Sequence, residues 1–154
     1  LGHSGRKGAV KKPWEGTNEP INNAWELLSA SAIAFNDKMA VPKEMTADDM
    51  NNVINQFENA AKNAEKVGFD MIELQVHHGF LLASFLSPLT NNRTDEFGGS
   101  LENRLRFPIQ VFNAVRENFP ADKPISVRIS ATDWAENSIS QEDVLFIASE
   151  FKRA

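Results

Sequence analysis

The sequence predicts an α/β fold in which parallel strands alternate with helices and each strand has one polar face, as in a barrel. Two observations lead to this prediction. Helical and strand patterns alternate along the second part of the chain, with no hairpin signal between the strands. Polar residues also occupy alternate positions in both strands. A strand of a doubly wound sheet is usually apolar on both faces, so a barrel strand that lines a site fits better.

A long loop is expected before the first helix. The first ~45 residues show little periodicity, by the turn-signal rule. A structureless segment of this length inside a compact domain is more often functional than idle. The turn-forming residues of this segment are Gly2, Gly5, Gly8, Pro13, Gly16, Pro20 and Pro42.

The first helix is predicted to begin after Thr46, which is a good N-cap, and to end at Gly68. A short strand, Met71 to Val76, follows it. Residues 79–99 are then expected to form a loop. The apolar positions that repeat with helical spacing in this first helix are Met50, Val53, Phe57, Ala60, Ala61 and Ala64.

A second helix is predicted after Ser100, and Pro108 should kink it or mark a break near its start. The second strand, "ISVRIS", follows Pro124. Ser140 caps a third helix. The inward positions of these two helices are Leu101, Leu105, Ile109, Phe112, Val115, Val144, Ile147, Ala148 and Phe151.

Strand alternation places Arg128 on a polar face. Glu73 and Gln75 share the polar face of the first strand, and Ser126, Arg128 and Ser130 share that of the second. We expect Arg128 to be buried there, and a buried charge needs a partner. Glu73 would provide a structural ion pair, whereas a bound anionic cofactor would provide a functional one.

Composition excludes several classes of protein. The chain has 154 residues, 42% of them hydrophobic, which suffices for a packed core. A net charge of −5 argues against a nucleic-acid partner. There is no cysteine, which excludes disulfides and is compatible with the cytoplasm. No apolar run approaches the ~20 residues that span a bilayer, so no membrane partner is expected.

The segment "IELQVHHGFL", residues 72–81, holds two of the three histidines of the chain. Gln75, His77 and His78 arrive where an apolar run ends. No metal site is expected from His77 and His78, because adjacent histidines on a turn point apart and no third ligand has suitable spacing. A polar network at the rim of a barrel and a substrate site both remain open from the residues alone.

Three blocks of sequence carry a resemblance to a known family. They are "LGHSGRKG", "GFDMIELQVHHGFLLASFLSPLTNNRTDEFGGSLENRLRF" and "ISVRISATDW". Together they resemble the old yellow enzyme family of FMN-dependent oxidoreductases over nearly the whole chain. The loop "PWEGTNEPINNAWELLSASAIAF" is similar to the flavin-oxidoreductase domain that some bacteria fuse to a salicylyl-CoA or 2-aminobenzoyl-CoA monooxygenase.

The resemblance implies a fragment of a TIM (β/α)₈ barrel, from the end of strand 3 to the helix after strand 5. Residues 1–154 would form the central part of one FMN-binding domain, incomplete at both ends. The strands that hold the FMN phosphate would belong to the remainder of the same barrel. A slice of a barrel leaves sheet edges unpaired, so the chain alone is expected to bind flavin poorly.

The resemblance also implies roles for individual residues. Arg128 matches the arginine beside the pyrimidine edge of FMN. Gln75 and His78 match the two donors that hold the substrate oxygen, and Gln75 replaces the usual histidine with an amide that still donates. Phe80 stands where many members have tyrosine. Strand alternation alone would pair Gln75 with His77, whereas the resemblance pairs it with His78. We follow the resemblance and place His77 off the site with no assigned role, because the strand is expected to end by Val76.

Other residues of these blocks are interpreted as structural. The block "RTDEFGGSLENR" is expected to pin a long loop to a helix start through Asp95, Glu102, Asn103 and Arg104. Phe57, Phe112 and Phe151 are interpreted as core. For His3, Arg6 and Lys7, a structural role and a role near the flavin are equally open.

The resemblance therefore implies an enzyme that transfers hydride from NAD(P)H through FMN. The acceptor would be a small molecule, either an α,β-unsaturated carbonyl or an aromatic acyl-CoA-derived substrate. It leaves room for a homo-oligomer or a fusion to a monooxygenase domain. Two alternatives stay open: a flavin-independent (β/α)₈ barrel enzyme, and a non-catalytic barrel remnant.

Overall fold

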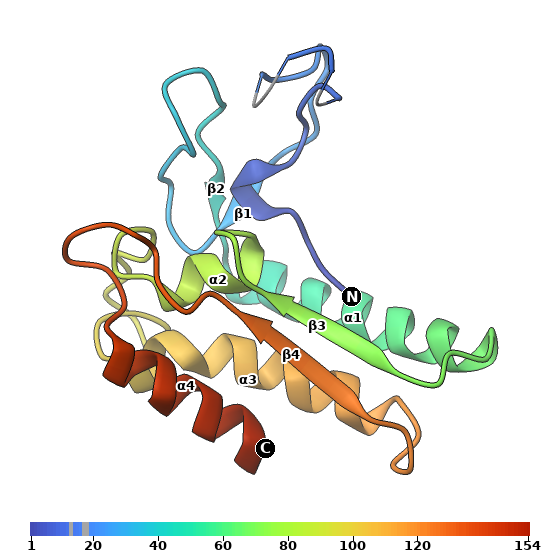
Figure 1. The fold of residues 1–154 in the computed structure, drawn as a ribbon. Helices are drawn as coiled ribbons and strands as arrows, with labels where there is room; N and C mark the ends of the chain where they lie inside the picture. The colour runs from blue at the N-terminus through green and yellow to red at the C-terminus, as the bar shows by residue number, and fades with distance from the viewer. Residues whose placement is uncertain (13, 17–18) are drawn as a thin grey trace.

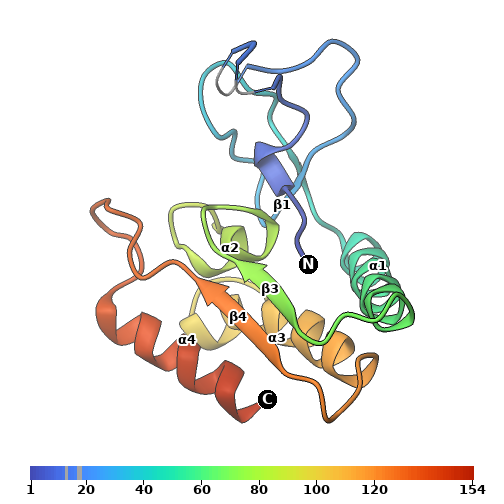
Figure 2. The ribbon, with the colours of Figure 1, turned by 45° about the vertical axis from the view of Figure 1, so that its right-hand side comes forward.

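A computed structural model describes residues 1–12, 14–16 and 19–154; Pro13, Thr17 and Asn18, which belong to the long predicted loop, lie outside the described residues. Helices lie along one side of a short parallel sheet, and a lobe of loops rises from its upper end (Figures 1 and 2). The elements are η1 (Gly5–Lys7), β1 (Leu28–Ser29), β2 (Lys43–Glu44), α1 (Ala47–Lys66), β3 (Ile72–Val76), α2 (Leu81–Leu86), α3 (Leu101–Glu117), β4 (Ile125–Ile129) and α4 (Gln141–Arg153).

The predicted helix starts are confirmed. Thr46 accepts a hydrogen bond from the backbone of Asp49, and Asp49 accepts one from the backbone of Thr46, which completes a capping box. Ser140 and Asp143 form the same arrangement at α4, and Ser100 caps α3. Each cap satisfies backbone N–H groups that have no partner within the helix, so each fixes where its helix begins.

The break that was one of the two expectations for Pro108 does not occur in α3. The helix runs from Leu101 to Glu117 without interruption, and Pro108 lies buried within it. Proline removes one hydrogen bond of the helix, but the neighbouring residues Phe107 and Val111 are completely buried. Tertiary packing therefore holds the helix together through a residue that favours a break.

Helix α2 lies within residues 79–99, which were predicted to be a loop. It spans only six residues, "LLASFL", and its N-cap makes no side-chain hydrogen bond. Such a short apolar run contains neither a cap nor enough turns to show helical periodicity. Leu81 and Phe85 are fully buried, so the helix is stabilised by packing rather than by local signals.

Strands β3 and β4 pair in parallel, as predicted. Their register places Ile72 opposite Ile125 and Gln75 opposite Arg128. The N-terminal residues run along the other edge of β3, where Gln75 N donates to Leu1 O at 2.8 Å and Leu81 N donates to His3 O at 3.0 Å. These two hydrogen bonds hold the first residues against the edge of β3 that β4 leaves free.

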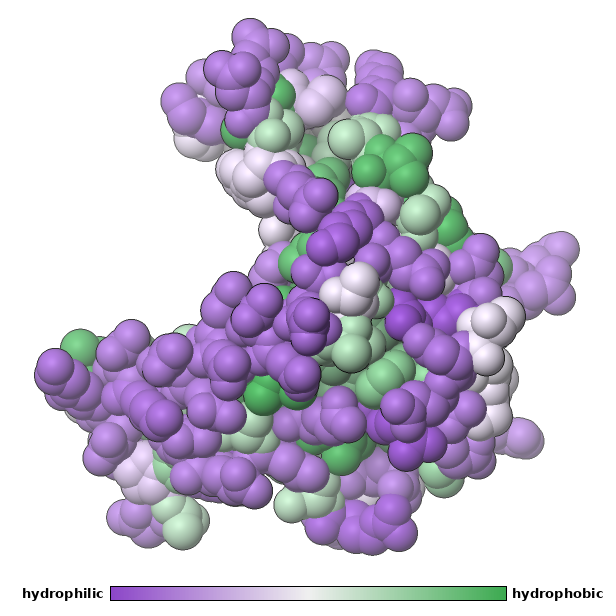
Figure 3. Space-filling view, turned by 180° about the vertical axis from the view of Figure 1, so that it is seen from behind, coloured by the Kyte–Doolittle hydropathy of each residue, from purple (hydrophilic) through white to green (hydrophobic). Residues whose placement is uncertain are grey.

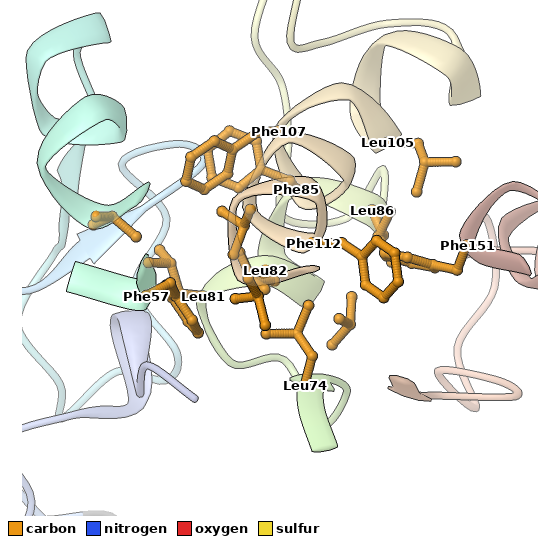
Figure 4. Packing of buried hydrophobic residues seen from close by; sticks show 14 of the residues in the cluster. Phe57, Leu74, Leu81, Leu82, Phe85, Leu86, Leu105, Phe107, Phe112 and Phe151 are labelled. Carbon is orange, nitrogen blue, oxygen red and sulfur yellow. The ribbon is translucent and has the colours of Figure 1, made fainter. Parts of the chain in front are cut away.

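The core lies between this sheet and the helices. Leu74 and Val76 of β3 have no exposed surface, and they belong to one cluster with side chains of all four α-helices (Figure 4). Phe57, Phe112 and Phe151 are part of this cluster, as predicted. The opposite face of the sheet carries Glu73 and Arg128, which are exposed.

The long loop forms a lobe of its own. A small second core of Ala9, Leu27 and Met39 holds it together. From behind, this lobe stands above the body and a hollow separates the two on one side (Figure 3). The short parallel pair β1–β2 lies at its base.

The capping box of α1 leads to a prediction about acid stability. A hydrogen bond from Lys43, followed by one from the Thr46 backbone, lowers the pKa of Asp49 from 3.8 to about 2. A lowered pKa contributes stability above pH 3.8, and this contribution is lost as the pH falls through about 2. Asp49→Asn should lower the free energy of unfolding by about 1 kcal/mol at pH 7.

This difference should be much smaller at pH 2 than at pH 7, as measured by urea unfolding at both pH values. Asp48→Asn is the matched control, because Asp48 is an exposed carboxylate in the same helical turn and makes no hydrogen bond among the described residues. A difference that persists unchanged at pH 2 would contradict the role of the Asp49 charge.

The open edge of β4 leads to a prediction about the isolated chain. Ile125, Val127 and Ile129 line an open groove together with Phe112 and Phe151. Unpaired strand edges with apolar side chains favour association. We expect residues 1–154, expressed alone, to form oligomers or aggregates in sedimentation experiments. A monomer with a cooperative thermal transition would contradict this expectation.

Candidate active site at the ends of β3 and β4

The open face of the sheet carries the polar residues that strand alternation predicted. Ser126 Oγ donates to Glu73 Oε2 at 3.2 Å. Arg128 forms no ion pair with Glu73 among the described residues, so the structural alternative for its charge is not realised. Arg128 was expected to be buried, but it is exposed, because two strands do not close a barrel over their inner face.

Gln75 and Arg128 lie side by side. They are register partners across β3 and β4, and both point to the open face because alternate residues of a strand share a face. Gln75 is partly buried beside the N-terminal segment, and its backbone is bonded to Leu1. Gln75 and Arg128 therefore occupy adjacent positions on the open face near the carboxyl ends of parallel strands, and the Gln75 amide lies close to Gly2 of the N-terminal segment.

His78 follows the end of β3. Its φ of +55° lies in the left-handed region, which histidine enters more readily than most residues. Two neighbours fix this turn: the backbone N of His78 donates to Ser130 Oγ at 3.0 Å, and Lys7 Nζ donates to its carbonyl at 2.9 Å. The side chain is exposed and lines a cavity. No hydrogen bond joins it to Gln75 in the described part of the chain.

His77 has the opposite environment. It is only 3% exposed, and both of its ring nitrogens are buried without a hydrogen-bond partner in the described structure. Its ring lies edge-on to that of His78, with 4.1 Å between the ring centroids. Burial, followed by the nearby charges of His78 and Arg128, lowers the pKa of His77, so its imidazole is neutral at neutral pH.

The N-terminal loop supports this turn. Gly5 has a φ of +58°, and a side chain there would lie 2.8 Å from the backbone of Leu81, so only glycine fits. His3 Nδ1 accepts the backbone N–H of Gly5 at 3.0 Å, which is a structural role. Lys7 Nζ lies 5.3 Å from the Phe80 ring centroid, in addition to its bond with His78. The sequence did not single out this contact of Lys7.

Arg6 holds a more distant part of the loop. Its Nη1 donates to the carbonyls of Ile33 and Ala34, at 3.1 and 3.0 Å. Its Nε is buried and has no partner among the described residues. Burial lowers the pKa of Arg6 from its usual value, although the group stays protonated at neutral pH.

A cavity of about 330 Å³ lies beside His78. Its walls come from the ends of β3 and β4, from α2 and from α4. Most of them are apolar, and Arg6 and Asp133 also belong to the lining. Asp133 Oδ2 accepts a hydrogen bond from Ser87 Oγ at 2.7 Å, which ties the loop after β4 to the end of α2.

Three of the four residues predicted to pin the loop between α2 and α3 do so: Asp95, Asn103 and Arg104. Asp95 accepts from Arg93 Nε at 3.0 Å and from the backbone of Phe97. Asn103 donates to Gly98 O, and Arg104 donates to Gly99 O and to Leu86 O. Glu102 lies in the first turn of α3. These hydrogen bonds fix the loop between α2 and α3, whose first residues line the cavity.

Within the described ranges, no group of three or more His, Asp or Glu side chains is arranged to hold a metal ion. The helices described are all too short or too polar to cross a membrane.

Sequence comparison shows which proteins this chain is similar to. The model of the NADH:flavin oxidoreductase / NADH oxidase family matches residues 9–153. The NADPH dehydrogenase of Clostridium acetobutylicum is 48% identical over 139 residues, which are 90% of this chain and 37% of the relative. The NADPH dehydrogenase of Bacillus subtilis is 38% identical over 152 residues, 99% of this chain and 40% of the relative. The chain thus spans about two fifths of these relatives.

Solved structures show the same similarity. A 2-naphthoyl-CoA reductase in complex with 2-naphthoyl-CoA superposes with a TM-score of 0.79 at 32% identity, over 84% of this chain and 20% of that one. An Old Yellow Enzyme from Pichia superposes with a TM-score of 0.73 at 32% identity, over 83% of this chain and 37% of that one. The predicted fold, a part of a (β/α)₈ barrel, is confirmed.

Proposed function

Because the chain belongs to the NADH:flavin oxidoreductase / NADH oxidase family, we propose that the protein containing it transfers hydride from NAD(P)H through FMN to a small conjugated substrate. The resemblance to the old yellow enzyme family is confirmed. FMN is the cofactor of this family and NAD(P)H its reductant. The activity belongs to the whole barrel, of which residues 1–154 form the central part in this proposal.

The pairing of Gln75 with Arg128 is the observation that carries the proposal. It places an arginine and a glutamine at adjacent positions on the open face, near the carboxyl ends of two parallel strands, where active sites of this barrel fold lie. Arg128 has no carboxylate partner among the described residues, so its charge is available to a ligand. The residues present therefore fit an anionic, planar cofactor.

FMN, when bound, supplies the centre that accepts and donates hydride. Arg128 would lie against its pyrimidine edge and stabilise negative charge there, which is electrostatic preorganisation. The β3–β4 register sets the backbone position of Arg128, and no ion pair holds its guanidinium among the described residues. No ion pair of Arg128 within the described residues would therefore have to break when the cofactor binds.

Gln75 and His78 would bind the oxygen of the substrate. The Gln75 amide is a weaker polarising donor than an imidazolium, and Phe80 offers no hydroxyl group. The acceptor in this proposal is an α,β-unsaturated carbonyl or an aromatic acyl-CoA-derived molecule. Likeness to a reductase solved with 2-naphthoyl-CoA supports the aromatic acyl class. A fusion to a monooxygenase domain, or a homo-oligomer, remains a prediction.

The role of Arg128 can be tested on the intact flavoprotein. Arg128→Ala should weaken FMN binding and lower the reduction potential of the flavin, because the cation that stabilises its reduced form is removed. Bound FMN and the potential are measured by absorbance during redox titration. Arg153→Ala, at an exposed arginine in the last turn of α4, is the matched control and should change neither.

The proposal fails if the intact protein is colourless and takes up no FMN on reconstitution. If the flavin in Arg128→Ala has the same reduction potential as in the wild type, Arg128 does not lie against the flavin edge. The family assignment would not be affected by that result.

Comparison of the two histidines tests the substrate site. His78→Ala should lower the affinity for a phenolate ligand by roughly tenfold to a hundredfold, because one hydrogen bond to a charged oxygen is lost. His77→Ala should cost much less, since His77 is enclosed and does not line the cavity. Titration of the phenolate charge-transfer band measures both. A larger loss in His77→Ala would reverse the assignment.

Gln75→His restores the commoner pair of donors. It should raise activity on simple enones, as measured by steady-state oxidation of NAD(P)H. Unchanged or lower activity with full FMN content would show that Gln75 does not contact the substrate oxygen.

A further inference from the structure

The cavity beside His78 has features that the hydride-transfer proposal does not use. Its volume of about 330 Å³ is at the lower end of the range for small-molecule sites. The apolar walls come from separate elements: Ala83 and Leu86 on α2, Ile129 on β4, and Ile139 and Ile147 at α4. A rigid apolar ligand of one or two rings matches this space better than a long flexible one.

Arg6 introduces a positive charge into this apolar lining. In the described part of the chain it has no carboxylate within ion-pair distance, and only its Nη1 forms hydrogen bonds, both to backbone carbonyls. Its Nε is buried without a partner. A partly buried cation without a counterion is costly, and an anionic ligand would offset that cost.

Asp133 does not neutralise Arg6. The two residues line the same cavity but form no ion pair, and Asp133 is bound instead to Ser87 at 2.7 Å. The Ser87–Asp133 bond joins the end of α2 to the loop after β4 in the wall of the cavity. The lining therefore combines apolar side chains with four hydroxyl groups, the hydrogen-bonded Asp133 carboxylate, His78, and one cation without a counterion among the described residues.

We propose that this cavity binds the body of a small aromatic carboxylate, with the carboxylate at Arg6. His78 lies both at the edge of this cavity and at the proposed site for the substrate oxygen. If the protein has the proposed hydride-transfer function, its substrate is then an aromatic molecule with two polar groups. One is the carbonyl held at Gln75 and His78, and the other is an anionic group held at Arg6. That part of the inference rests on the proposed function, whereas binding in the cavity does not.

Binding of 2-naphthoate and of its neutral isostere 2-naphthamide to the intact flavoprotein tests the proposal. Isothermal titration calorimetry measures both without relying on flavin absorbance. Arg6→Gln should weaken 2-naphthoate binding by roughly tenfold to a hundredfold, because a charge-assisted hydrogen bond is lost. It should leave the affinity for 2-naphthamide within about twofold. Arg6→Lys, which keeps the charge, should retain binding of the acid.

Two further variants separate recognition from folding. Ala83→Phe places a ring in the cavity from α2 and should weaken the binding of both ligands. Arg153→Gln removes an exposed positive charge far along the chain and should weaken neither. Melting temperature and FMN content identify any variant that is misfolded. If Arg6→Gln is misfolded, Ala83→Phe and Arg6→Lys still test whether the ligand binds in the cavity and whether the charge at position 6 is needed.

Three results would overturn the proposal. Arg6→Gln could lower the affinities for 2-naphthoate and for 2-naphthamide equally, or Ala83→Phe could leave 2-naphthoate binding unchanged. The wild-type protein could also fail to bind 2-naphthoate at millimolar concentration. If the protein takes up no FMN but still binds 2-naphthoate in a way that depends on Arg6, the proposed binding in the cavity is supported. The proposed hydride-transfer function is then refuted. An FMN-loaded protein that binds no 2-naphthoate would refute the cavity alone.

Discussion

The parallel register of β3 and β4 is the constraint on which the site depends. Because side chains alternate along a strand, a shift of one residue would turn Gln75 and Arg128 towards the helices and expose Leu74 and Val127. The complete burial of Leu74 makes such a shift costly. The hydrophobic core therefore fixes the position of the polar face, although no residue of that face contributes to the core.

Beyond the ends of the strands, the side chains are positioned by hydrogen bonds between loops. His78 is tied to Ser130 on one side and to Lys7 on the other, and Ser87 is tied to Asp133. Behind them, buried Arg93 donates to the carbonyls of Ala30 and Met45. Three successive loops of the barrel are thus linked, so the geometry of the site depends on residues far apart in the sequence.

The features that could be predicted from the sequence are those set by neighbouring residues, namely the helix starts and the faces of the strands. Thr46, Ser100 and Ser140 cap their helices through neighbouring backbone groups, and strand alternation placed Gln75 and Arg128 on one face. Sequence-based prediction missed α2, which depends on packing, and the contact of Lys7 with His78, which joins residues 71 positions apart. It also placed Arg128 in a buried setting, because alternation gives the face of a side chain but not what covers that face.

Charge at the strand ends differs from that of the whole chain. The net charge is −5, yet Arg6, Lys7 and Arg128 all lie around the turn after β3, where Glu73 and Asp133 are the nearby carboxylates. Burial lowers the pKa values of His3 and His77, so these rings add no charge at neutral pH. The positive potential therefore comes from groups that stay protonated over the physiological range. Such a site attracts anions across this whole pH range, although the chain as a whole is acidic.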